Sequence, residues 1–146
     1  PEGVGAAGAG LASPDGRGRL VLVADDEPLV RTLVVRTLEE EGYTVLAAED
    51  GAMALQLLDQ GRLSPDVVIT DVIMPRRNGR QLHDALIARW PDLPVLFISG
   101  HAGEEAVLQR LVPREAPFLQ KPFSPDALAR AVADLLQSRW PPPGHR

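Results

Sequence analysis

Five side chains that could take part in polar chemistry stand directly after four short apolar runs of the sequence. The runs span residues 20–24, 67–70, 95–98 and 117–120, and they are followed by Asp25 and Asp26, by Asp71, by Ser99 and by Lys121, respectively. If the runs are parallel strands, these residues lie at the carboxyl ends, outside which such sheets bind their ligands. We therefore expect three carboxylates, a hydroxyl and an ammonium group at one edge of a sheet.

If the strand order places these strands side by side, the three carboxylates crowd together and predict a site for a divalent cation. Neighbouring carboxylates make each other's ionisation less favourable, and a bound cation relieves that repulsion. Because the expected ligands are all oxygen atoms, Mg²⁺, Mn²⁺ or Ca²⁺ fits the site better than zinc does. The loop at residues 72–75, directly after Asp71, could offer a main-chain carbonyl as a further ligand.

A carboxylate, a cation, a lysine and a hydroxyl together suit phosphoryl transfer, because charge on the phosphoryl oxygens must be neutralised while a nucleophile attacks. Asp71 is the expected nucleophile, since it ends the run at 67–70, which we expect to form the central strand. Lys121 would balance the charge of the incoming group.

Each of these residues also has an ordinary structural explanation. Asp25 and Asp26, with Glu27, precede Pro28, and an acidic run in this position is typical of a helix N-terminus. A single aspartate after a strand, or a single lysine, is often a solvated surface residue. The conjunction of all five side chains at one edge is harder to explain in this way, so we favour a functional site.

Short apolar runs alternate with segments of helical period through residues 19–140. Successive apolar residues are typical of strands that are covered on both faces, and we expect such strands at 20–24, 43–48, 67–70, 95–98 and 117–120. The alternation predicts an α/β fold with a doubly wound, five-stranded parallel sheet and helices on both of its faces.

The intervening segments carry signals for helices. One predicted buried stripe consists of Leu29, Val30, Leu33, Val34 and Leu38. Asn78 with Gln81 predicts a capped helix start, and Ser124 before Pro125 predicts another. The segment 104–112 is short and weakly periodic. His83 is expected on the solvated side of its helix, and His101 is expected to be incidental.

Composition excludes several classes of protein. The chain has 146 residues, 45% of them apolar and 24% charged, which is typical of one globular domain. Its net charge of −5 argues against direct nucleic-acid binding, and the absence of cysteine excludes disulfides and thiolate metal sites. Since no uncharged run reaches the roughly 18 residues of a membrane span, we expect a soluble, cytoplasmic domain without membrane contact.

Glycine and proline are concentrated at the two ends of the chain. Residues 1–18 are predicted to be a flexible linker, residues 19–140 the folded domain, and residues 141–146, which begin with three prolines, a disordered tail. The chain begins at Pro1 without an initiator methionine, so we expect it to be a segment of a longer protein.

Four motifs resemble those of the receiver domain of two-component response regulators. They are Asp25 and Asp26 after an apolar run, DVIMP at residues 71–75 with Asn78 and Gly79, ISG at residues 98–100, and KPF at residues 121–123. The resemblance covers residues 19–140 and implies the flavodoxin-like (βα)5 fold with strand order 2-1-3-4-5. It also implies a signalling domain, not an enzyme, that takes a phosphoryl group from a phosphohistidine of a histidine kinase or histidine phosphotransfer domain.

The resemblance implies a role for each candidate residue. Asp71 would be the phosphoacceptor, while Asp26, Asp71 and the main-chain carbonyl of Ile73 would ligate Mg²⁺, and Asp25 would complete the metal site through water. Ser99 and Lys121 would contact the phosphoryl oxygens. The Lys121–Pro122 peptide bond would be cis. Phe118 would be the aromatic switch residue, without the hydroxyl of the tyrosine that often stands there.

A finer resemblance, at residues 93–101 and 117–123, is to receivers at the C-terminus of hybrid sensor histidine kinases. Such a domain could also form a weak homodimer. Two alternatives remain: a Mg²⁺-dependent phosphohydrolase that forms an aspartyl-phosphate, and a degenerate receiver that acts only as an interaction module. Phosphatases of the haloacid-dehalogenase type carry a second acid two residues after the nucleophile, where this chain has Ile73.

Overall fold

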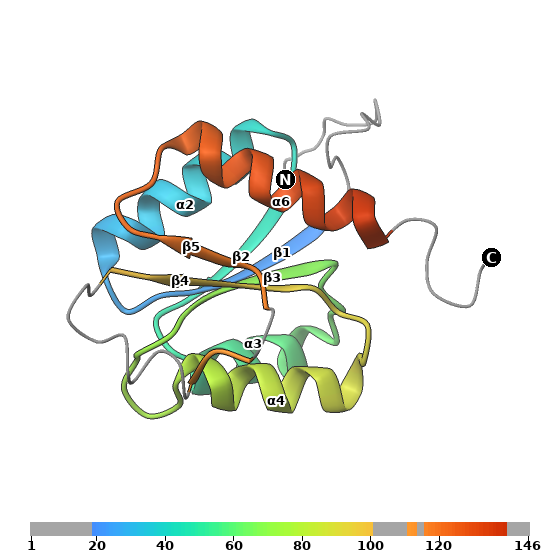
Figure 1. The fold of residues 1–146 in the computed structure, drawn as a ribbon. Helices are drawn as coiled ribbons and strands as arrows, with labels where there is room; N and C mark the ends of the chain where they lie inside the picture. The colour runs from blue at the N-terminus through green and yellow to red at the C-terminus, as the bar shows by residue number, and fades with distance from the viewer. Residues whose placement is uncertain (1–18, 101–110, 114–115, 140–146) are drawn as a thin grey trace.

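Five parallel strands form one sheet in the order β2-β1-β3-β4-β5 (Figure 1). The computed structural model describes residues 19–100, 111–113 and 116–139. The strands are β1 (Leu20–Ala24), β2 (Thr44–Ala48), β3 (Val67–Asp71), β4 (Val95–Ser99) and β5 (Phe118–Gln120). The expected α/β class and the strand order 2-1-3-4-5 are therefore confirmed.

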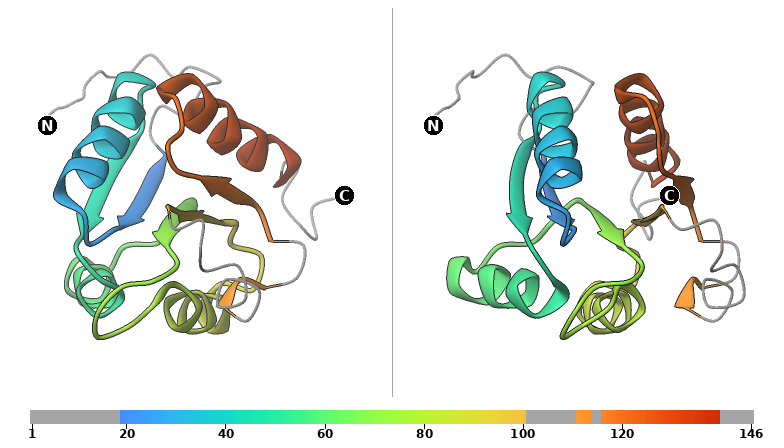
Figure 2. Two further views of the ribbon diagram at one scale, coloured as in Figure 1. Left: turned by 60° about the vertical axis from the view of Figure 1, so that its left-hand side comes forward. Right: turned by 90° about the vertical axis from the view of Figure 1, so that its left-hand side faces the viewer.

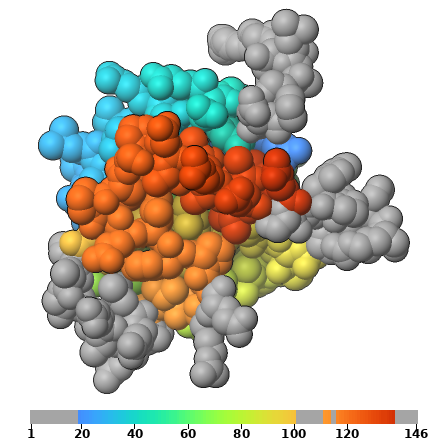
Figure 3. All heavy atoms as spheres, turned by 45° about the horizontal axis from the view of Figure 1, so that its top comes forward, coloured from blue at the N-terminus to red at the C-terminus, as the bar shows by residue number. Residues whose placement is uncertain are grey.

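In the part of the chain that the structure describes, two helices cover each face of the sheet. They are α2 (Pro28–Glu40), α3 (Gly51–Gly61), α4 (Gly79–Arg89) and α6 (Pro125–Arg139). Figure 2 shows α2 and α6 on one face and α3 and α4 on the other, and Figure 3 shows α6 at the surface beside α2, which it contacts. Each face buries its own apolar cluster.

The alternation of side chains along β1 explains why both faces are apolar. Val21 and Val23 belong to the cluster under α2 and α6, whereas Leu22 and Ala24 belong to the cluster under α3 and α4. All five residues of β3 and all five of β4 are buried. Burial of each large apolar side chain contributes about 1.5–3 kcal/mol, so a continuous apolar run is what a central strand requires.

The predicted helix starts are confirmed. Asn78 and Gln81 form a reciprocal capping box at α4, with hydrogen bonds of 2.9 Å in both directions. The Ser124 hydroxyl accepts a hydrogen bond of 3.0 Å from the N–H of Ala127 at the start of α6. The strand ends differ slightly from expectation, because the main chains of Asp71 and Ser99 still belong to β3 and β4.

Two expectations about burial are wrong. Leu29 is 86% exposed and Leu33 is 39% exposed, because the buried stripe of α2 follows Val34, Thr37 and Leu38. The side chain of His83 is only 17% exposed, because its ring packs on Phe97 with 5.7 Å between the centroids. The first deviation leaves apolar surface uncovered on α2.

Some predicted features lie outside the described residues. They are the linker at 1–18, the tail at 141–146, His101, and residues 104–110 of the weakly periodic segment. Within the described ranges, none of the helices is both long and apolar enough to cross a membrane.

Candidate functional site

Three carboxylates meet at the carboxyl edge of the sheet. Asp71 ends β3, and Asp25 and Asp26 follow β1, which is the parallel neighbour of β3. Oxygen atoms of the three groups all lie within 4.8 Å of one another. Asp25 and Asp71 are buried, whereas Asp26 is exposed. The predicted acidic cluster therefore exists, and it is open to solvent through Asp26.

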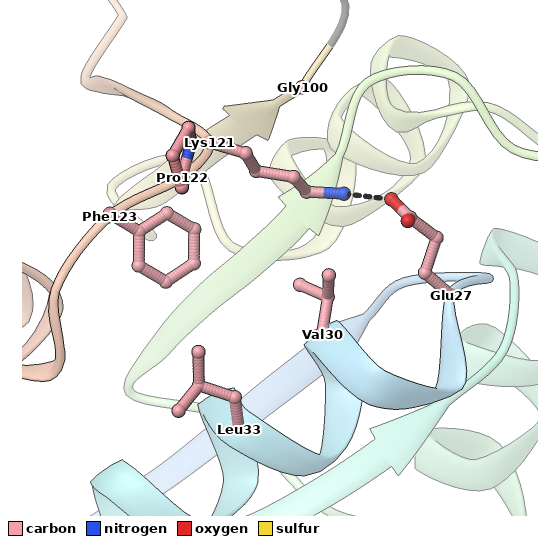
Figure 4. A pocket seen from close by; sticks show the side chains of 7 residues that line it. All are labelled: Glu27, Val30, Leu33, Gly100, Lys121, Pro122 and Phe123. Atoms are coloured by element: carbon pink, nitrogen blue, oxygen red, sulfur yellow. Dashed lines mark hydrogen bonds and ion pairs between the residues drawn. The ribbon is translucent and has the colours of Figure 1, made fainter.

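Lys121 reaches the cluster from the segment after β5. Its Nζ lies 2.6 Å from Glu27 Oε1, 3.3 Å from Asp25 Oδ2 and 3.4 Å from Asp71 Oδ2, and Figure 4 shows the contact with Glu27. The N–H of Lys121 also donates a hydrogen bond of 2.7 Å to the carbonyl of Ser99. Sequence reasoning missed Glu27 as a partner of Lys121, since an acid before Pro28 fitted a helix N-terminus.

Ser99 lies beside the acidic cluster at the end of β4. It is buried, and the preceding residue, Ile98, pairs with Asp71 across the sheet. The N–H of Val72 donates a hydrogen bond of 3.1 Å to the carbonyl of Ile98. The two central strands thus continue their pairing up to the site, which places Asp71 and Ser99 on neighbouring strand ends.

One oxygen of each buried carboxylate is held by the main chain. Asp71 Oδ1 accepts a hydrogen bond of 2.8 Å from the N–H of Val72, and Asp25 Oδ1 accepts one of 2.9 Å from the N–H of Glu27. The remaining Asp25 Oδ2 is buried and accepts no hydrogen bond from the described residues. Lys121 Nζ lies within ion-pair distance of it, at 3.3 Å, but does not form a hydrogen bond with it. A buried anionic oxygen without a hydrogen bond suits a cation.

Burial and mutual charge repulsion shift the pKa values of the site residues. Burial and the neighbouring charge of Asp25 raise the pKa of Asp71 to about 7, although Lys121 and the N–H of Val72 act in the opposite direction. Burial also raises the pKa of Asp25. Burial would lower the pKa of Lys121, but its hydrogen bond to Glu27 and the charges of the two aspartates outweigh this and raise it.

The donor set fits a hard divalent cation. Carboxylates and main-chain carbonyls are the ligands that Mg²⁺ and Ca²⁺ take. A cation here would neutralise Asp25 Oδ2, which accepts no hydrogen bond from the described residues, and would favour the ionised form of Asp71, whose pKa is raised. Ile73, the expected carbonyl ligand, lies in the loop between β3 and α4.

Gly79 lets the start of α4 approach the main chain of Asp71 closely. Its N–H donates a hydrogen bond of 2.9 Å to the carbonyl of Val72. A Cβ atom at Gly79 would lie only 2.4 Å from the carbonyl oxygen of Asp71, which is closer than any side chain permits. The loop that contains Ile73 is therefore anchored beside the acidic cluster.

A pocket of about 340 Å³ opens next to Lys121. Figure 4 shows that α2 contributes Val30 and Leu33 to its wall and that the segment after β5 contributes Pro122 and Phe123. The Lys121–Pro122 peptide bond is cis, as expected. Phe118, the expected switch residue, lies on the edge strand β5, pairs with Phe97 and is 42% exposed.

A doubly wound sheet with an acidic cluster and a lysine at its carboxyl edge has the charged groups that phosphoryl transfer requires. Residues 21–133 match the family model of the response regulator receiver domain. The chain belongs to this family, and its function is that of a receiver domain in two-component signalling.

Individual relatives agree with this membership. The chain is 38% identical over 121 residues to the sensor kinase CckA of Brucella abortus and 35% identical over 127 residues to the response regulator MprA of Mycobacterium sp. strain KMS. The matches cover 82% and 85% of this chain but only 13% and 53% of those proteins.

Solved structures agree as well. A response regulator receiver protein from Sinorhizobium medicae WSM419 matches with a TM-score of 0.73 and 32% identity, over 83% of this chain and 96% of that one. The receiver domain of NtrX from Brucella abortus matches with a TM-score of 0.71 and 33% identity, over 81% of this chain and 98% of that one.

Proposed function

We propose that Asp71 accepts a phosphoryl group from a phosphohistidine of a histidine kinase or a histidine phosphotransfer domain. The observation that carries this assignment is the position of Asp71, a buried carboxylate at the end of the central strand with Lys121 3.4 Å away. The transfer makes a bond between phosphorus and an oxygen of Asp71 as the bond between phosphorus and the imidazole nitrogen breaks. The imidazole leaves with the electron pair.

The hydrogen bonds of Asp71 select the oxygen that attacks. Oδ1 accepts a hydrogen bond from the N–H of Val72, so we assign the nucleophile to Oδ2, which accepts only a long hydrogen bond of 3.4 Å from Lys121. The ammonium group of Lys121 then neutralises charge on the transferred oxygens. We assign the hydroxyl of Ser99 to the same oxygens, since Ser99 ends the strand next to Asp71.

Asp26, Asp71 and the carbonyl of Ile73 would hold Mg²⁺, with Asp25 acting through water. When bound, Mg²⁺ supplies charge neutralisation between the carboxylates and the phosphoryl oxygens. The protein's own part is to favour the charged form of Asp71: Lys121 and the N–H of Val72 lower its pKa, against burial and the charge of Asp25, which together raise it to about 7.

We infer that the phosphohistidine partner docks over α2 and the pocket beside Lys121. A donor must reach Asp71 at this edge, and the adjoining surface offers Leu29, which is 86% exposed, and Leu33, which is 39% exposed. An exposed apolar patch next to a reactive site is typical of an interaction surface. A helix of the partner would cover this patch.

We further propose that the chain is the receiver part of a hybrid sensor kinase. The similarity to the sensor kinase CckA supports this assignment, as do the motifs at residues 93–101 and 117–123. Such a receiver takes part in signalling without turning over an external substrate, and it would act in the cytoplasm, where kinases use ATP.

Incubation with acetyl phosphate separates this proposal from its two alternatives. A receiver incorporates about one phosphoryl group per chain, and only with Mg²⁺. A phosphohydrolase would release many equivalents of phosphate, which Ile73 argues against, since that enzyme class carries an acid at this position. A degenerate receiver would incorporate none. Intact-protein mass and phosphate release, measured on one sample with Mg²⁺ or EDTA, identify the correct case.

A further inference from the structure

We propose that Asp50 and Arg76 form a latch that holds the loop after Asp71 and thereby positions the main-chain carbonyl of Ile73 for the metal ion. Asp50 precedes α3, and Arg76 lies in the loop between β3 and α4. The inference rests on the proposed function, because it concerns how the metal site is shaped. Neither residue belongs to the acidic cluster.

Asp50 uses its two carboxylate oxygens for two different contacts. Oδ1 accepts a hydrogen bond of 2.8 Å from the N–H of Met53 and so caps α3. Oδ2 accepts a hydrogen bond of 2.7 Å from Arg76 Nε and a second one from the same guanidinium group. Asp50 is only 2% exposed, so the helix cap fixes the position of the anion that Arg76 binds.

The main chain of Arg76 has a conformation that arginine rarely adopts. Its φ angle is 63°, in the left-handed region that is unfavourable for residues other than glycine by about 1 kcal/mol or more. The Arg76 side chain is 61% exposed, so burial does not compensate for this cost. The ion pair with the buried Asp50 is the contact that offsets it.

A main-chain contact lies beside the ion pair. The N–H of Gly51 donates a hydrogen bond of 3.2 Å to the carbonyl of Arg77. A Cβ atom at Gly51 would lie 2.7 Å from that carbonyl oxygen. Only glycine therefore allows the start of α3 to lie this close to the loop. The latch and this contact fix the middle of the loop.

The loop is thus held on both sides of Ile73. On one side β3 ends at Asp71, and on the other Arg76 and Arg77 bind the start of α3. Magnesium requires near-ideal octahedral ligand geometry. Groups that orient a metal ligand without touching the metal commonly change metal affinity by about tenfold or more when they are removed. Asp50 and Arg76 act as positioning residues of this kind.

Two substitutions break the latch with little other change. Asp50→Asn keeps a side-chain oxygen for the cap of α3 but removes the charge that Arg76 binds. Arg76→Asn removes the cation and places asparagine, which tolerates the left-handed region, at that position. The matched control is Arg89→Gln, which breaks the exposed ion pair between Arg89 on α4 and Asp59 on α3, at the opposite ends of these helices.

The test measures Mg²⁺ binding by titration of backbone amide chemical shifts. It also measures amide hydrogen exchange without metal at residues 73, 74 and 76–78. We expect both latch variants to bind Mg²⁺ about tenfold more weakly, the double variant to be no weaker than the weaker single variant, and exchange in the loop to be faster. Arg89→Gln should match the unmodified protein in both measurements.

Two results would overturn the latch. In one, exchange becomes faster but Mg²⁺ affinity stays the same, which would make the ion pair merely structural. In the other, neither quantity changes. A failure of the proposed function is distinguishable from both, since the unmodified protein itself would then bind no Mg²⁺.

Discussion

Raising the pH from 5 to 8 without a divalent cation should destabilise the domain, because the raised pKa of Asp71 is linked to folding. The ordinary pKa of the group is 3.8, and in the folded protein it is about 7. Between these values the folded state binds more protons than the unfolded state, so the free energy of unfolding falls as pH rises. The burial of Asp25, which raises its pKa as well, acts in the same direction.

The magnitude follows from the difference between the two pKa values. At about 1.4 kcal/mol for each factor of ten in proton affinity, the whole change from 3.8 to about 7 corresponds to about 4 kcal/mol. Only the part between pH 5 and about 7 is lost over the range tested, so the expected loss is about 3 kcal/mol. Mg²⁺ should restore stability at pH 8, by about 2.7 kcal/mol at a concentration 100 times its dissociation constant. The same addition at pH 5 should have a smaller effect, because protons then compete for the carboxylates.

Urea unfolding followed by circular dichroism, at pH 5 and pH 8 with Mg²⁺ or EDTA, measures these free energies. Asp71→Asn is the control, since it removes the titrating group while it keeps the shape of the side chain. This variant should lose most of the pH dependence and most of the response to Mg²⁺. The reasoning is refuted if the unmodified protein in EDTA is equally stable at both pH values, or if Asp71→Asn shows the same loss.

The other predictions concern the surroundings of Asp71. Lys121→Ala should fold, because Lys121 belongs to neither of the two apolar clusters. It should bind beryllofluoride, a phosphoryl mimic, at least about tenfold more weakly, since a charge-assisted hydrogen bond contributes about 1.5–3 kcal/mol; unchanged affinity would exclude Lys121 as a phosphoryl contact. Glu27→Gln should bind the mimic more tightly, because the carboxylate 2.6 Å from Lys121 competes for the same ammonium group; weaker binding at saturating Mg²⁺ would contradict this. Gly79→Ala should lower the free energy of unfolding by about 1–3 kcal/mol, because its Cβ would meet the Asp71 carbonyl at 2.4 Å. Gly61→Ala, which meets only the side chain of Leu63, should cost less in the same urea titration, and equal losses would count against the packing argument.

The central strands and their terminal residues could be predicted from the sequence. A buried strand in a doubly wound sheet must be apolar on successive positions, so β3 and β4 are visible as continuous runs, and the carboxyl edge then follows from the fold. Given the strand order that the family resemblance implies, the convergence of Asp25, Asp26 and Asp71 was therefore predictable without any side-chain geometry.

Contacts between distant residues could not be predicted in the same way. Lys121 and Glu27 are 94 positions apart, and Asp50 and Arg76 are 26 apart. Each of these charged residues has an equally good local explanation as a helix cap or a solvated group. The burial of His83 was missed because its contact, Phe97, belongs to a different element and leaves no trace in the helical period of α4.

The most direct test of the account is to locate the phosphoryl group on the chain. The protein is incubated with acetyl phosphate and Mg²⁺, the acyl phosphate is reduced with borohydride, and peptides are analysed by mass spectrometry. The account predicts that Asp71 alone is modified, that Asp71→Asn abolishes the modification, and that Asp59→Asn, an exposed aspartate on α3, leaves it unchanged. Modification at another residue, or full labelling of Asp71→Asn, would contradict it.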